Sequence, residues 1–284
     1  MENKSIIQKA FDITKDNIIL AQPLVLYLLA ASFTFAGLAM QSNKYTYVIF
    51  LITNILLFTA FLAGWFSMIK QGILLNRRIE NGEFQKAEDR AAASWDLGKA
   101  FFPGVGDYFL HVTLTTLAYV TFFILLTYAF FKLGQNYLPH HVLDLQKINT
   151  LANSSPAEIQ KFVYSLSFEQ LKAINIWMLY LGSVAFGYTF ITLFWFPAIF
   201  DSKESFWLAP IKSFSRNIVF LFKNFLGSLG VILFLLMLNT FISILSVIFN
   251  LNVVLAIVGL IISFYFTTYA VVLIFLYYDE RRKN

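Results

Sequence analysis

The sequence predicts an all-α integral membrane protein, built as a polytopic bundle of transmembrane helices. Hydrophobic residues make up 58% of its 284 positions and charged residues only 13%, whereas soluble domains carry about 25% charged residues. A chain with so few charges has too few polar side chains to cover a surface that faces water, but it can cover a surface that faces lipid. Six apolar stretches are also long enough to cross a bilayer core, which needs about 20 helical residues.

The predicted spans follow one another along the whole chain, which is therefore expected to form one integral membrane domain, residues 1–284. Their ranges are about 18–40, 45–68, 108–131, 173–200, 225–249 and 253–277. Only Asn250, Leu251 and Asn252 separate the last two spans, which predicts a tight antiparallel hairpin of helices. Pro197, near the end of the fourth span, predicts a kink there.

The connection between the third and fourth spans, at about 137–172, predicts a small helical cap on the outer face. Ser155-Pro156-Ala157-Glu158 has the capping-box pattern, with Pro at the first helical position. Ser167-Phe168-Glu169-Gln170 repeats the capping signal immediately before the fourth span. Two helix starts within one connection favour an ordered cap over a disordered loop.

Lys and Arg residues are distributed unequally between the two sides of the predicted bundle. The side with both termini and the second and fourth connections receives 16 of the 21, and the other side receives 5. Because cytoplasmic connections carry the excess of Lys and Arg, both termini are predicted to lie in the cytoplasm. The protein is then a multi-pass component of the cell (inner or plasma) membrane. The net charge of +5 reflects this topology, and no nucleic acid partner is expected.

Three cytoplasmic segments, before the first, third and fifth spans, combine an apolar stripe at helical spacing with basic residues elsewhere. Before the fifth span the stripe consists of Ile211, Phe214, Ile218, Leu221 or Phe222, and Phe225. An amphipathic helix of this kind lies along the inner interface, with its basic face toward lipid phosphates. An ordinary connecting helix packed on the bundle explains the pattern equally well. On the first interpretation, the candidate contacts for anionic lipid are Arg77, Arg78, Arg216 and Lys223.

The same order of elements occurs three times, which predicts an internal threefold repeat. A cytoplasmic amphipathic helix and then two spans occupy about 1–70, 84–200 and 205–278. The prediction rests on the hydropathy pattern more than on matching residues between the repeats. The main match in residues is that aromatic and basic residues precede both Asn17 and Asn224.

No catalytic, cofactor-binding or metal site is predicted. No Asp, Glu, Lys or Arg lies well inside a predicted span, which argues against an ion-coupled pump and a voltage sensor. The chain has no Cys, and so no disulfide or thiolate site. Tyr277 and Tyr278, followed by basic residues, indicate an anchor at the membrane interface. His140, His141 and Asp144 suggest an acyltransferase or metal site, but their spacing is one residue short of the acyltransferase pattern, and an ordinary interfacial loop is favoured.

Three passages carry a family resemblance: Gly72…Arg77-Arg78…Gly82-Glu83, Phe206-Trp207-Leu208-Ala209-Pro210…Ser213…Lys223-Asn224-Phe225, and Tyr277-Tyr278-Asp279-Glu280-Arg281-Arg282. They resemble poorly characterised bacterial membrane families, namely the membrane domain fused to some glycerophosphoryl diester phosphodiesterases and related six-span proteins that stand alone. The resemblance covers nearly the whole chain. It implies a bundle of elbow helices and spans, with no catalytic residues and no particular activity.

These observations favour a non-enzymatic membrane protein that organises lipid or a membrane partner complex. Its expected partners are membrane lipids and another membrane protein, and no cofactor is expected. The alternative is a transporter or permease component for a lipid or amphipathic substrate, which the absence of charges from the spans permits. A membrane enzyme acting on a lipid headgroup is a third hypothesis, and it rests on His140, His141 and Asp144 alone.

Overall fold

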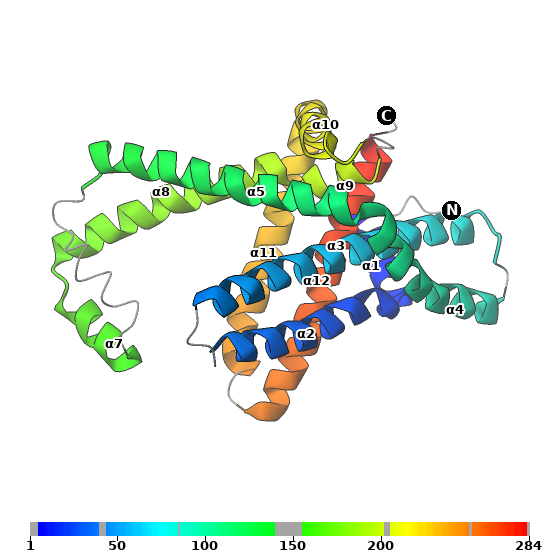
Figure 1. Cartoon of the computed structure of the whole chain (residues 1–284), viewed down its shortest axis with the longest axis horizontal. Coiled ribbons are helices and arrows are strands. Elements are labelled where there is room, and N and C mark those ends of the chain that lie inside the picture. Colours follow the sequence, from blue (N-terminus) through cyan, green and yellow to red (C-terminus); the bar gives the residue numbers. More distant parts are fainter. Residues whose placement is uncertain are drawn as a thin grey trace. The chain divides into compact units, whose positions relative to one another are not determined.

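The computed structural model describes residues 5–39, 44–84, 86–139, 155–201, 205–249 and 252–282 of the chain. Within these ranges all the regular elements are helices (Figure 1), which confirms the predicted all-α class. Five of the described helical stretches are long and apolar enough to cross a membrane: Tyr45–Glu80, Ala87–Tyr137, Phe168–Ile199, Phe225–Phe249 and Val253–Arg281. The prediction of a multi-pass membrane protein is therefore confirmed.

The predicted first span, about 18–40, corresponds to the second part of a bent pair of helices. α1 (Ile6–Asp16) ends at Asn17, and the short 3₁₀ helix η1 (Ile18–Ala21) leads into α2 (Gln22–Ala39). The chain bends by 85° at this break. Counted as one span, the pair brings the described total to six, the predicted number.

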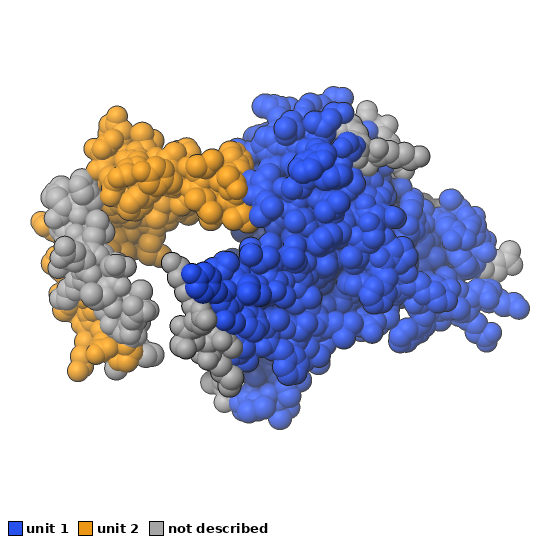
Figure 2. Space-filling model, viewed as in Figure 1, with its two compact units in different colours: residues 1–118, 191–284 blue, residues 119–190 orange. Residues whose placement is uncertain are grey.

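The described residues form two compact units, which Figure 2 distinguishes by colour. The first unit comprises residues 1–118 and 191–284, with α1, η1, α2, α3 (Lys44–Glu80), α4 (Ala87–Asp96), η2 (Leu97–Ala100), the start of α5 (Phe101–Tyr137), α9 (Trp195–Ile199), α10 (Ala209–Lys223), α11 (Phe225–Phe249) and α12 (Val253–Arg281). The second unit comprises residues 119–190, with the rest of α5, α7 (Pro156–Ser165) and nearly all of α8 (Phe168–Thr192).

α3 continues well past Met68, where the predicted second span ends, and stops at a glycine. Gly82 has a φ of +83°, a conformation that glycine adopts without strain. The N–H of Gly82 donates to the carbonyl of Ile79, and the N–H of Glu83 donates to that of Arg78, both at 3.0 Å. These are the hydrogen bonds of a Schellman C-cap. The extra turns place the first basic residues of the second connection on a helix and not in a loop.

The helices α1 and α10 both end on an asparagine, and the two ends have the same hydrogen bonds. At the end of α1, the N–H and the Nδ2 of Asn17 both donate to the carbonyl of Ile13, at 3.1 and 2.9 Å. At the end of α10, Asn224 makes the same two bonds to Phe220, at 2.9 and 3.2 Å. This shared arrangement agrees with the predicted repeat. α4 ends instead on Leu97, so the threefold repeat stays a prediction.

The fourth predicted span is broken at residues 193–194, between α8 and α9. Pro197 explains the break, because its ring clashes with the carbonyl four residues earlier and it has no N–H to donate. Asn217 of α10 bonds to the groups that the break leaves open. Its Oδ1 accepts from the N–H of Phe194 (3.0 Å), and its Nδ2 donates to the carbonyl of Ile191 (2.6 Å). A side chain of α10 is thereby built into the end of the fourth span.

The core of the first unit lies where α3, α9 and α12 meet, and it is largely aromatic. The ring of Phe66 lies 5.1 Å from that of Phe275 and 6.3 Å from that of Phe200, measured between centroids. Phe194 stacks on Tyr277 at 5.6 Å. This packing holds the C-terminal end of α12 beside α3 and the segment that follows α9.

In the second unit, α5 and α8 are joined by tyrosine side chains. The hydroxyl of Tyr188 donates to the carbonyl of Tyr119 (2.6 Å), and the hydroxyl of Tyr180 donates to that of Phe130 (2.9 Å). Each bond satisfies a polar group at the tip of an otherwise apolar ring, as buried tyrosines require. The two helices are thus connected along much of their length.

Both predicted capping patterns in the connection between the third and fourth spans are confirmed. At the start of α7, Ser155 and Glu158 make a full capping box. At the start of α8, the N–H of Gln170 donates to the hydroxyl of Ser167 (3.3 Å). The rest of the predicted cap, residues 140–154 with His140, His141 and Asp144, lies outside the described residues.

Candidate functional site

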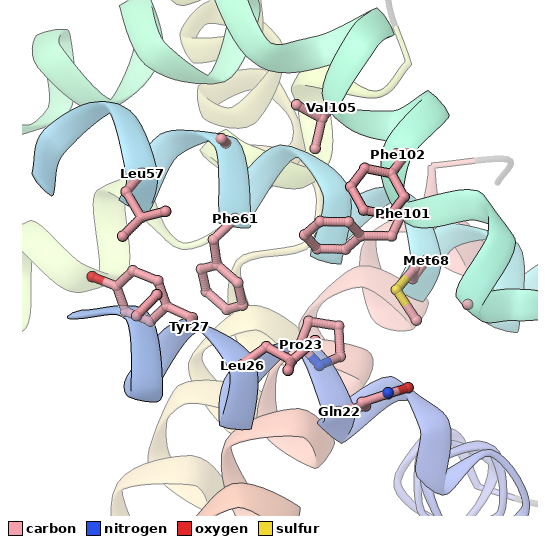
Figure 3. A pocket seen from close by; sticks show the side chains of 13 residues that line it. Gln22, Pro23, Leu26, Tyr27, Leu57, Phe61, Met68, Phe101, Phe102 and Val105 are labelled. Atoms are coloured by element: carbon pink, nitrogen blue, oxygen red, sulfur yellow. The ribbon is translucent and has the colours of Figure 1, made fainter. Parts of the chain in front are cut away.

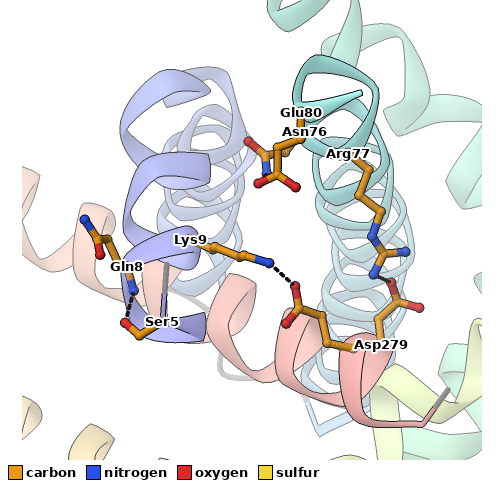
Figure 4. A network of polar contacts seen from close by, with 8 residues as sticks. Ser5, Gln8, Lys9, Asn76, Arg77, Glu80 and Asp279 are labelled. Atoms are coloured by element: carbon orange, nitrogen blue, oxygen red, sulfur yellow. Dashed lines mark hydrogen bonds and ion pairs between the residues drawn. The ribbon is translucent and has the colours of Figure 1, made fainter. Parts of the chain in front are cut away.

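Charged side chains from several segments of the first unit meet at the C-terminal end of α12. Lys9 of α1 pairs with Glu280 (3.0 Å), and Arg77 of α3 pairs with Asp279. Figure 4 shows these two cations reaching α12 from the two neighbouring helices. All four side chains are only partly exposed, so solvent screens the pairs less than it screens pairs on an open surface.

A small cavity of about 150 Å³ lies among these charges, between α3, the segment after α9, and α12. Lys70 donates to the carbonyl of Phe200, and Arg282 pairs with Asp201 and with Asp279 (3.1 Å). Burial raises the pKa of Asp201, and the adjacent Arg282 and Lys70 only partly oppose that rise. The charged side chains that line the cavity thus pair with one another or with a backbone carbonyl. In the described residues, no three His, Asp or Glu side chains are grouped as a metal site requires.

A larger hollow of about 610 Å³ lies between α10, its C-terminal cap Asn224, and the end of α12. We call it the basic pocket, and its polar lining consists chiefly of Arg216, Lys223, Arg281, Arg282, Ser215 and Asn224. None of the described residues that line it is Asp or Glu. A concave cluster of one sign of charge concentrates its field and attracts a ligand of the opposite sign.

The local sequence explains why these cations converge. Asn224 ends α10, so Lys223 is the last residue of that helix and Phe225 is the first of α11. α11 and α12 pack against each other as a hairpin (Figure 1). The start of α11 therefore meets the end of α12, where Arg281 and Arg282 lie.

The cations of the basic pocket differ in how far they are already neutralised. Arg282 is engaged by Asp201 and Asp279. Among the described residues, no ion pair involves Lys223 or Arg281, and both side chains are exposed. These two residues therefore carry the positive charge that is most available to a ligand.

Exposed apolar side chains occur in the lining of the basic pocket and near Lys223 in the sequence. Val219 lines it, and Phe222 and Leu226, on either side of Lys223 in the sequence, are 80% and 81% exposed. The face of α10 that packs on the protein includes the fully buried residues Ala209, Ser213 and Asn217. α10 thus packs on the bundle, as a connecting helix does, while it presents apolar side chains outward, as a helix in contact with lipid does.

The structure separates the four residues predicted to contact anionic lipid. Arg216 and Lys223 come together in the basic pocket. Arg77 lines the small cavity instead. Arg78 pairs with Glu83 at 2.6 Å, beside the end of α3. Two of the four predicted residues therefore share one site, while the other two have carboxylate partners of their own.

Sequence reasoning missed Arg281 and Arg282 as members of this site and treated them only as an interfacial anchor. A signal for them was present, because the predicted tight hairpin implies that the start of the fifth span meets the end of the sixth. No such signal exists for Asp201. It pairs with Arg282 only because the aromatic core brings two distant segments together.

An apolar groove of about 460 Å³ lies between α2, α3 and the start of α5 (Figure 3). Tyr27 and Phe61 form part of its wall, with their rings stacked at 4.6 Å, and Phe101 lines it from α5. None of the described residues that line it is charged, and Gln22 is among its few polar residues. Its chemistry suits a hydrocarbon chain.

No protein-family model matches this chain, and no curated protein or solved structure matches it either. The resemblance to the membrane domain of glycerophosphoryl diester phosphodiesterases therefore stays a prediction. Function must be inferred from the residues and their geometry.

Proposed function

We propose that this chain is a non-enzymatic, multi-pass protein of the cell membrane that organises anionic lipid at the basic pocket. The observation that carries the proposal is the convergence of Lys223, Arg216 and Arg281 at a hollow whose lining includes the exposed apolar side chain of Val219. With both termini in the cytoplasm, as the distribution of Lys and Arg indicates, the pocket faces the cytoplasmic leaflet. Each Lys or Arg near such an anionic surface contributes about 1 kcal/mol of attraction.

These magnitudes set the size of the expected effect. Lys223 and Arg281 together supply roughly 2 kcal/mol, which corresponds to an enrichment of anionic over neutral lipid of about 30-fold beside them. The resemblance to bacterial six-span families supports the same role, because it implies elbow helices and spans without a catalytic centre. The outward apolar face of α10 also suits the membrane protein partner that the sequence leads us to expect.

The lipid composition around the protein tests this proposal. The full-length chain is reconstituted into bilayers of equal phosphatidylglycerol and phosphatidylcholine, extracted in polymer nanodiscs, and its lipids are counted by mass spectrometry. We expect phosphatidylglycerol to be enriched around the wild type and much less around Arg216→Gln/Lys223→Gln. The matched control, Arg78→Gln/Lys99→Gln, removes the same charge from residues with local carboxylate partners and should keep the enrichment. Equal proportions of the two lipids around the wild type refute the proposal.

The apolar groove favours a second candidate function, the passage of a lipid or amphipathic substrate. None of the lining residues that the structure describes is charged, and the groove's volume of about 460 Å³ is large enough for an acyl chain. Ala60→Trp places a bulky ring in its wall and should slow the flux of a fluorescent lipid across proteoliposomes. A wild type that moves no lipid faster than protein-free liposomes do removes this candidate.

A further inference from the structure

We infer that the basic pocket is a discrete site for one glycerophospholipid headgroup, whose phosphate is bound by Lys223 and Arg281. The inference rests on the proposed function, which requires only that anionic lipid gather near this pocket. It adds a stoichiometry of one, a headgroup class and two named phosphate-binding residues.

The shape of the basic pocket indicates a ligand and not a diffuse layer of lipid. Its cations come from α10, from the junction of α10 with α11, and from the end of α12, and they converge on one hollow. The volume of about 610 Å³ falls within the roughly 300–1,000 Å³ that is typical of small-molecule sites. A hollow of this size admits a phosphate together with the glycerol that carries it.

The charges that remain available fit a single phosphate. Asp201 and Asp279 hold the guanidinium of Arg282, which lines both the small cavity and the basic pocket. Lys223 offers a compact charge with three N–H donors, whereas Arg281 offers a planar fork that binds two phosphate oxygens at once. The two residues thus complement one phosphodiester.

Neutral groups beside the cations suit the hydroxyls of a glycerol headgroup. Ser215 and Asn224 both line the pocket. The Nδ2 of Asn224 donates to the carbonyl of Phe220, so its Oδ1 is the atom that can accept a hydrogen bond from a headgroup hydroxyl. A choline headgroup has no hydroxyl and brings its own positive charge toward the four cations. The pocket should therefore prefer phosphatidylglycerol to phosphatidylcholine.

The surroundings of the pocket indicate a lipid and not a soluble phosphate. Lys223 ends α10 two residues before α11 begins, and Arg281 ends α12. Both α11 and α12 are apolar enough to cross a membrane. The pocket therefore lies at the height where the spans meet the headgroup layer. Phe222 and Leu226, both highly exposed, provide an apolar surface for the acyl chains of a lipid whose phosphate is in the pocket.

Binding of short-chain probes to the full-length protein in detergent tests this inference. The probes are dioctanoyl phosphatidylglycerol, dioctanoyl phosphatidylcholine and glycerol phosphate without chains, and native mass spectrometry with titration gives the number bound and the Kd. We expect one phosphatidylglycerol per chain, bound about tenfold or more tightly than either other probe. Lys223→Gln/Arg281→Gln should raise its Kd by about tenfold for each cation removed, which is the usual effect of losing a charge-assisted hydrogen bond.

Control variants separate binding from folding. Lys223 and Arg281 are exposed, so the double variant should melt at the wild-type temperature. Arg281→Lys keeps the charge but loses the fork, and it should bind with intermediate affinity. Arg78→Gln/Lys99→Gln should bind as the wild type does.

The outcomes distinguish this inference from the proposed function. If Lys223→Gln/Arg281→Gln binds phosphatidylglycerol as tightly as the wild type does, the inference is overturned, although enrichment in bilayers still supports the proposed function. Tight binding of glycerol phosphate without chains also overturns it, because the site is then one for a soluble phosphate. If the wild type gathers no phosphatidylglycerol in bilayers, the proposed function fails as well.

Discussion

Replacing Asn217 with leucine should destabilise the fold more than any other polar-to-apolar change on α10. Asn217 is fully buried. Its amide joins the broken end of the fourth span to α10, because Oδ1 accepts from the N–H of Phe194 and Nδ2 donates to the carbonyl of Ile191. Leucine has nearly the same size but can neither donate nor accept a hydrogen bond. Both backbone groups therefore lose their partner at a break that Pro197 makes unavoidable.

The size of the effect follows from those two groups. Leaving a buried donor or acceptor unsatisfied costs about 1–3 kcal/mol, which gives roughly 2–6 kcal/mol for two. Side-chain hydrogen bonds between membrane helices average only about 0.6 kcal/mol, because the unfolded chain finds other partners within the membrane. The groups that lose their partner here belong to the backbone of a broken helix, so the cost should exceed that average. We expect a value near the bottom of the range for two groups, about 2 kcal/mol.

The loss should be measured by SDS-induced unfolding in detergent, followed by tryptophan fluorescence. The chain has five Trp residues, and the buried Trp195 begins α9, directly after the break. Ser215→Leu, an exposed change on the same helix, is the matched control and should shift the free energy of unfolding by less than about 0.5 kcal/mol. If Asn217→Leu unfolds within that same margin of the wild type, the assignment of Asn217 as the partner of the broken helix is wrong.

Two further pairs of variants test the charged cluster and the packing of α3 against α5. Arg282→Gln leaves the buried carboxylate of Asp201 without its nearest cation and should lower the free energy of unfolding by about 2 kcal/mol, less than for a fully buried pair because Arg282 is 35% exposed. Burial raises the pKa of Asp201 above its ordinary value of 3.8. The unfolded chain therefore loses this proton at a lower pH than the folded chain does, and the fold loses stability as the pH rises from 3.8 to the raised value. The melting temperature of Asp201→Asn, relative to the wild type, should therefore rise over that pH interval, and a fall contradicts the reasoning. Gly104→Ala should cost roughly 1–3 kcal/mol in the same unfolding assay, because the added Cβ would lie 2.3 Å from the Cβ of Ser67. Gly106→Ala, which meets open space, should gain up to about 1 kcal/mol, and equal effects of the two changes refute the close approach.

The helices were predictable from the sequence because each depends on residues within its own segment. Hydropathy locates the spans, and the capping residues Ser155 and Ser167 locate two helix starts in the connection between the third and fourth spans. Hydropathy does not say where a helix stops once it leaves the apolar region. α3 continues to Glu80 and is ended by the positive φ of Gly82, although the predicted apolar span ends at Met68.

The break in the fourth span was only half predictable. Pro197 is visible in the sequence and indicates a distortion. That Asn217 would bond to the freed backbone groups is not visible, because it depends on how α10 folds back against α9. Nothing in the sequence distinguishes a polar residue of a connecting helix that bonds to another helix's backbone from one that is exposed to solvent.

Only one aspect of the candidate site was predictable from the sequence, namely that its basic residues belong to the same predicted side of the membrane. The topology argument counts Arg77 and Lys223 equally, because each adds one positive charge to the same side. Binding depends instead on the charge that remains after pairing, and pairing is decided by contacts between distant segments. Asp279 comes from the last turns of α12 and engages Arg77, whereas Lys223 lies in a hollow with no carboxylate among its described lining residues. Two residues that are equivalent in the sequence therefore have opposite expected roles, one joining helices and one binding an anion.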